Sequence, residues 1–130
     1  MSAATTPIFT DAVRHAVAQV TTANAALDGT GTPVTIFTAG ADGSCISKVT
    51  AKAIVTTTTG MIRLFVHNGT TAFLIAELTV DAITPSATVA AWTEDWTPPG
   101  GALYLPTGYS LRATTEKTET FNIHAIGGDF

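Results

Sequence analysis

The clearest pattern in this chain is a pair of apolar segments on either side of an Asn-Gly dipeptide at residues 68–69. Residues 60–67 and 72–80 alternate between the two faces of an extended chain, with Ile62 and Leu64 on the more apolar one. Asn-Gly accepts the positive φ angles of a tight turn, so the pattern predicts a β-hairpin. One face of this hairpin is almost wholly apolar, and a second layer must cover it, as in a β-sandwich.

Shorter alternating segments fill most of the remaining chain, and glycine, proline and asparagine separate them. They are residues 33–38, 44–56, 86–96, 102–105 and 109–115, and a final segment that starts at Phe121 and stops at Gly127-Gly128. Residues 12–23 fit either a short helix capped by Thr10 or a strand, and the alternation favours the strand. These segments predict an all-β fold, a single-domain antiparallel β-sandwich, with a jelly roll of about eight strands as the preferred topology.

The first residues do not follow the alternation. Small residues and Pro7 dominate residues 1–11, and Ile8 and Phe9 have no periodic apolar partners. We therefore expect residues 1–15 to form an extended N-terminal arm and residues 16–130 to form the sandwich. Ile8 and Phe9 are candidates for contact with a neighbouring subunit.

The composition suggests a surface with few charges. Only 12% of the residues are charged, against about 25% in an average soluble protein. Such a domain either has a partner that covers part of its surface or is a compact, threonine-rich monomer. The mean hydropathy is +0.32, but no long apolar run predicts a membrane span. Six scattered basic residues and a net charge of −4 argue against nucleic acid as a partner.

No set of residues has the spacing of a catalytic or metal site. His15, His67 and His124 lie far apart in the sequence, and Glu94 and Asp95 are adjacent, so a strand would send them to opposite faces. Cys45 alternates in register with Val49, Ala51 and Ala53. This pattern predicts a core cysteine rather than a nucleophile. We expect no enzyme activity, no cofactor and no metal.

The aromatic residues near the end of residues 86–96 are the best candidates for a binding site. Trp92 and Trp96 flank the acidic pair, and Tyr104 follows a Pro-Pro-Gly-Gly loop. Exposed rings of this kind form either the centre of a protein interface or a platform on which a sugar stacks. The structural alternative is that Trp92 fills the sandwich and Trp96 closes its end.

Several phrases resemble those of small virion proteins of tailed bacteriophages. They are residues 35–44 (TIFTAGADGS), 53–65 (AIVTTTTGMIRLF), 77–80 (ELTV), 105–113 (LPTGYSLRA) and 127–130 (GGDF). The chain as a whole resembles the capsid decoration, or cement, type. That resemblance implies a β-sandwich, commonly trimeric, that binds the major capsid protein where shell subunits meet and stabilises the expanded head. It implies no catalytic residues.

A second function is compatible with the same residues. A jelly-roll module that binds carbohydrate, on a tail or head fibre, would use Trp92, Trp96 and Tyr104 to hold the host surface. No charged segment followed by an apolar segment opens the chain, so we expect synthesis in a cytoplasm. The resemblance implies that this is the cytoplasm of the host bacterium and that the protein finally lies in the virion, on the capsid surface.

Overall fold

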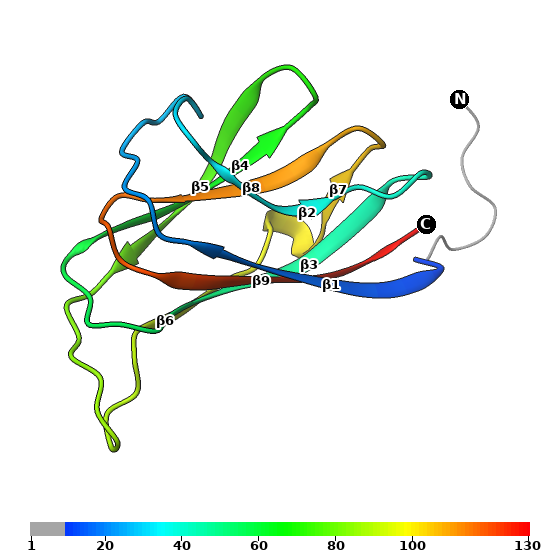
Figure 1. Ribbon diagram of the computed structural model, residues 1–130. Coiled ribbons are helices and arrows are strands. Elements are labelled where there is room, and N and C mark those ends of the chain that lie inside the picture. The colour runs from blue at the N-terminus through cyan, green and yellow to red at the C-terminus, as the bar shows by residue number, and fades with distance from the viewer. Residues whose placement is uncertain (1–9) are drawn as a thin grey trace.

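Alternating side chains produce two antiparallel sheets in the computed structural model, which describes residues 10–130 (Figure 1). Sheet 1 contains β1 (Ala12–Val20), β9 (Phe121–Asp129), β3 (Ser44–Ala53) and β6 (Thr93–Trp96), in this order, and β7 (Leu103–Leu105) also pairs with β3. Sheet 2 contains β2 (Val34–Thr38), β8 (Ser110–Thr115), β4 (Gly60–His67) and β5 (Ala72–Val80). The two sheets pack face to face, which confirms the all-β, single-domain sandwich.

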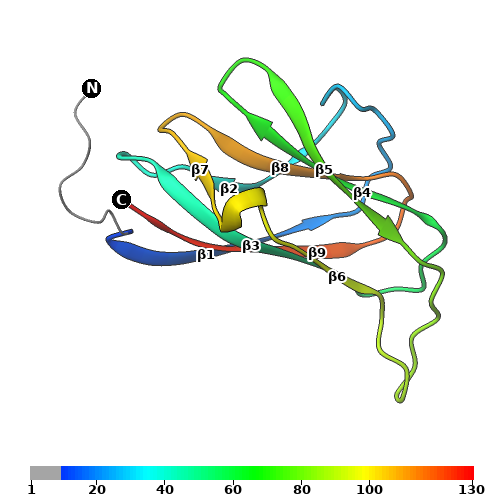
Figure 2. The same ribbon diagram turned by 180° about the vertical axis from the view of Figure 1, so that it is seen from behind.

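The strands pair in a nested order. β4 pairs with β5, β3 with β6 and β7, β2 with β8, and β1 with β9. Each pair therefore encloses the pairs that lie between its strands in the sequence. A single 3₁₀ turn, η1 (Pro99–Gly101), connects β6 to β7, and residues 81–92 project from the sandwich as a long loop (Figure 2).

The central hairpin forms where the sequence predicts it, although Asn68 does not take the positive φ of the predicted tight turn. Its loop covers residues 68–71, with Gly69 at a φ of 96°. The Asn68 side chain accepts hydrogen bonds from the backbone N–H groups of Thr70 and Thr71 at 3.0 and 2.8 Å. An asparagine before a glycine stabilises this turn because its side chain satisfies backbone donors that the ladder leaves free.

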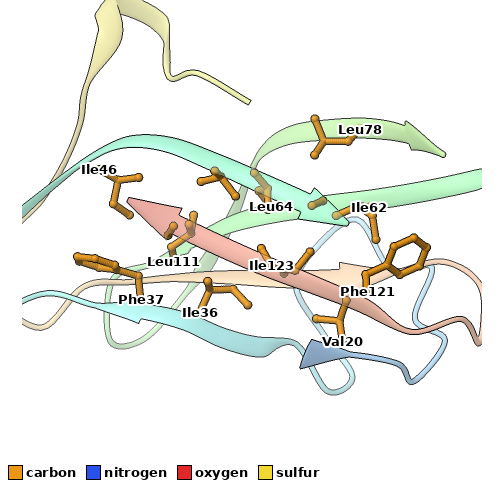
Figure 3. Packing of buried hydrophobic residues seen from close by; sticks show 14 of the residues in the cluster. Val20, Ile36, Phe37, Ile46, Ile62, Leu64, Leu78, Leu111, Phe121 and Ile123 are labelled. Carbon is orange, nitrogen blue, oxygen red and sulfur yellow. The ribbon is translucent and has the colours of Figure 1, made fainter. Parts of the chain in front are cut away.

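The core lies between the sheets and consists of the inward residues of both (Figure 3). Ile62 and Leu64 of β4 are fully buried there, as are Ile123 and Ala125 of β9. The alternation therefore identified these inward faces correctly. Phe121 is also buried, and the Trp92 ring packs edge to face against it with centroids 5.7 Å apart.

A β-bulge in β3 overturns the prediction of a core cysteine. The register between β3 and β9 shifts between Ile46 and Lys48, so Ser47 is an extra residue. Ile46 consequently fills the core, and Cys45 faces outward and is only partly buried. One inserted residue reverses the faces on one side of the bulge because side chains alternate with a period of two.

Three predicted boundaries are also wrong. β1 begins at Ala12 and pairs with β9 from its first residue, so residues 12–15 belong to the sandwich and not to an arm. The strand predicted over 86–96 is limited to β6, because Ser86 forms a turn with Val89. The last strand continues through Gly127 and Gly128 to Asp129.

Residues 21–33 cover the outer face of sheet 2. A Cβ atom on Gly29 would lie 2.3 Å from the Cβ of Ala72 and 3.6 Å from the ring of Phe65, so the segment approaches the sheet very closely. Leu64 and Val66, the neighbours of Phe65, face the core, so Phe65 points to the opposite face of β4. It is nevertheless fully buried. The Asn24 N–H also donates to the Thr115 carbonyl at 2.8 Å. This loop therefore gives sheet 2 a second, smaller apolar layer.

Candidate functional site

Trp92 does not lie on a surface that a partner could contact. Its side chain is 3% exposed and packs against Phe121 inside the sandwich. The proposal that Trp92 contributes to an interface is therefore wrong, and the structural alternative is correct for this residue. A tryptophan that follows a loop can be drawn into the core because its large ring buries much apolar area.

Trp96 and Tyr104 do not form a common platform. Trp96 is opposite Val49 in the register of β3 and packs in part against the core. Tyr104 is opposite Cys45, is 56% exposed and lies beside the ring of Phe130, with centroids 5.8 Å apart. Since Val49 points inward and Cys45 outward, the two rings are on opposite faces of sheet 1.

The other two candidates, Ile8 and Phe9, lie outside the residues that the structure describes. Their proposed contact with a neighbouring subunit stays a prediction.

The most exposed apolar surface lies instead on the outer face of β1 and β9. Val13 is 88% exposed, Val17 59% and Ile126 36%. Cross-strand pairing joins His15 to Ile126 and Val17 to His124. We call the outward surface formed by Val13, His15, Val17, His124 and Ile126 the β1–β9 face.

Shallow hollows border this surface. One, of about 200 Å³, is lined by Val13, Arg14, His15, His124 and Ile126. A second, of about 230 Å³, lies toward Cys45 and Ser47 and shares Val13 and Ile126 with the first. The β1–β9 face is therefore uneven, which suits contact with protruding side chains of a partner.

The one charged side chain of β1, Arg14, is held on the inner side of this strand. Arg14 donates to the Thr38 carbonyl, lies 3.3 Å from the Asp129 carboxylate and places its guanidinium 3.9 Å from the centre of the Phe37 ring. Ser44 donates its hydroxyl hydrogen to the same carboxylate. This network ties β1, β9, β3 and β2 together, and it leaves the outward side of β1 without a charge.

The charges on the outer face of sheet 1 lie on its other half, which begins at Lys48, opposite Ile126 in the register of β3 and β9. Lys48 on β3 is 3.1 Å from Asp95 on β6, and Lys52 donates to the Ala91 carbonyl and the Thr93 hydroxyl. A hydrogen bond from Thr50, together with the Lys48 ammonium, lowers the pKa of Asp95. The outer face of sheet 1 thus has an apolar half on β1 and β9 and a charged half on β3 and β6.

Sequence reasoning missed the β1–β9 face because the N-terminal arm that it predicts includes residues 12–15. The alternation of Val13, His15 and Val17 was the signal, since it continues the strand pattern of residues 16–20 without a break.

Three further observations concern the described part of the chain. Residues 10–130 contain no group of three or more histidine, cysteine, aspartate or glutamate side chains that could hold a metal ion. No helix in this same range has the length and apolar character that a membrane span requires. His67, which is on sheet 2, accepts a hydrogen bond at Nδ1 from the Gly69 N–H at 3.1 Å.

Comparison with known protein families, with curated proteins and with solved structures finds no match to this chain.

Proposed function

We propose that this chain is a structural protein of a tailed-phage virion that binds the outside of the capsid shell and stabilises the expanded head. The observation that supports this proposal best is the β1–β9 face, where Val13, Val17 and Ile126 are exposed together without a charged side chain among them. A monomer gains nothing from such a surface, whereas a protein that is buried against a shell does. The resemblance to decoration proteins gives the partner, the major capsid protein.

The mechanism is physical. Burial of an apolar surface in a shell contact avoids the desolvation cost that lysine or glutamate would add. A specific contact of standard size buries about 1,600 Å² in total. Because the protein binds the assembled shell and not its separated subunits, its binding free energy adds to the stability of the shell by mass action.

A jelly-roll topology is part of this proposal. The nested pairing of β1 with β9, β2 with β8, β3 with β6 and β7, and β4 with β5 supports it. In a jelly roll, nested pairs of this kind are divided between two packed sheets. This topology is used by viral capsid domains, although it also occurs in lectins.

A trimer is the oligomer that the resemblance implies. Three copies around one axis would present three β1–β9 faces to the shell, and simultaneous contacts would raise the overall affinity through multivalency. Sedimentation equilibrium of the purified protein, with and without the shell protein, measures the oligomer directly.

Co-sedimentation with empty expanded heads and, separately, with isolated tails tests the proposed function. We expect saturable binding to heads alone, and we expect Val13→Glu and Val17→Glu to weaken it at least about tenfold, since each buries a charge in the contact. Thr84→Glu is the control, because Thr84 is exposed on the projecting loop. Binding to tails alone would favour the fibre-associated carbohydrate module instead, and undiminished binding of both valine variants would show that the contact lies elsewhere.

A further inference from the structure

Two of the three histidines, 109 residues apart in the sequence, meet on the outer face of sheet 1. The Nε2 atom of His124 lies 3.1 Å from the Nδ1 atom of His15, and the ring planes are inclined by 80°. Cross-strand register explains the contact, because His15 is opposite Ile126 and His124 is opposite Val17. The two histidines are thus diagonal neighbours on one face, within reach of each other.

We propose that His15 and His124 together bind one divalent transition-metal ion, such as Zn²⁺, Ni²⁺ or Cu²⁺. Imidazole nitrogens suit these ions and bind Zn²⁺ at about 2.0–2.1 Å. Two nitrogens on one tetrahedral ion are then roughly 3.3 Å apart, by simple geometry from that bond length. The observed 3.1 Å separation of the nitrogen atoms is close to this value. To bind one ion, each ring must turn so that the two lone pairs point to the ion and no longer toward the other ring.

Metal binding changes only the position of one hydrogen. In the free pair, one of the two facing nitrogens donates a hydrogen and the other accepts it. A metal needs a lone pair from both, so the hydrogen moves to the far nitrogen of its own ring, Nδ1 of His124 or Nε2 of His15. Both rings stay neutral, and no oxidant is required.

The surroundings leave space for the rest of the coordination shell. The hollow of about 200 Å³ beside the pair is walled by Val13 and Ile126. Water or a carboxylate from solution can complete the coordination there. A pair of histidines provides two of the four ligands of a typical zinc site, so the ion is exchangeable.

The nearby positive charges do not oppose a cation at this position. Arg14 is directed to the inner side of β1, where Asp129 balances it. Lys48 is directed to β6, where it pairs with Asp95. The ion would therefore be held by the two imidazoles, and both nearby cationic side chains are paired with carboxylates.

Titration of the untagged, purified chain with Ni²⁺ and with Zn²⁺, against a chromogenic competing chelator, tests the proposal. We expect one ion per chain, and a decrease in affinity of at least about tenfold in His15→Gln and in His124→Gln, since each removes one of two ligands. His67→Gln is the matched control, because His67 lies on the other sheet. Cys45→Ser is a second control, because Cys45 lines the adjoining hollow.

Thermal unfolding of the same variants without metal shows whether they remain folded, as we expect because none of the four side chains is in the core. With saturating metal, the wild-type Tm should rise and that of the His15→Gln, His124→Gln double variant should not. The proposal is overturned if the wild type binds no ion, if binding survives the double variant, or if either control variant loses it. None of these measurements depends on the role of the chain in a virion.

Discussion

The outer faces of the two sheets differ in what covers them. On sheet 2, residues 21–33 fold across the strands, so that Phe65 is fully buried outside the main core. On sheet 1, Val13 and Val17 are more than half exposed. Both faces carry apolar side chains, but the chain covers only one of them itself. The uncovered face is the one that we expect a partner to cover.

The largest expected difference is in the free energy of unfolding, when one apolar side chain is truncated on the covered face and one on the uncovered face. Phe65→Ala should lower the free energy of unfolding by about 3–5 kcal/mol, because it leaves a cavity beneath residues 21–33. Val17→Ala should change it by no more than about 0.5 kcal/mol, because the side chain is already exposed to solvent. Urea denaturation followed by tryptophan fluorescence measures both. A large loss for Val17→Ala would mean that the β1–β9 face is already covered in the purified protein.

The next largest effect on stability concerns residues 21–33, which cover the outer face of sheet 2. Gly29 has a φ of +78°, and a Cβ atom there would lie 2.3 Å from Ala72, so Gly29→Ala should push residues 21–33 off the sheet and cost about 1–3 kcal/mol. Gly108→Ala is the control, since Gly108 also has a positive φ but no atom within 4 Å of the added methyl. Limited proteolysis should cut residues 21–33 faster in the Gly29 variant alone. Equal cutting in both variants would show that the close approach does not hold the loop.

The smallest expected effect is on the pH dependence of Tm, and it concerns the charged half of the outer face of sheet 1. Because the pKa of Asp95 is lowered in the folded chain, its carboxylate stabilises the fold above the unfolded pKa of 3.8. That contribution is lost as the pH falls from 3.8 through the lower folded value. Asp95→Asn should therefore lower Tm slightly at pH 7 and have no effect in strong acid. Glu94→Gln, at the exposed neighbouring position, is the control, and a difference that persists in strong acid would contradict this account.

Much of the fold could be predicted from the sequence because burial between two sheets selects residues with a period of two. The central hairpin and the inward faces of β4 and β9 follow from this period. The bulge at Ser47 could not be predicted, because one extra residue changes no composition and leaves no turn signal. Cys45 faces outward and not into the core because of that bulge.

The candidate site was harder to predict than the fold. Trp92 was chosen for its residue type, but whether an aromatic ring faces the core or the solvent depends on the path of the loop before it. The His15–His124 pair depends on the register between the first and last strands, which no local pattern encodes. Alternation indicates the faces of a strand, and only the pairing of strands indicates which side chains meet.

The nested strand order has a consequence for how the chain folds. Pairing β1 directly with β9 requires closure of a loop of about 100 residues, which is entropically costly and slow. The β4–β5 hairpin closes only a four-residue loop, residues 68–71, and brings the ends of the next pair of strands close together. Each pair that forms shortens the loop that the following pair must close. The chain can therefore fold outward from its central hairpin, with the strands that carry the β1–β9 face joining last.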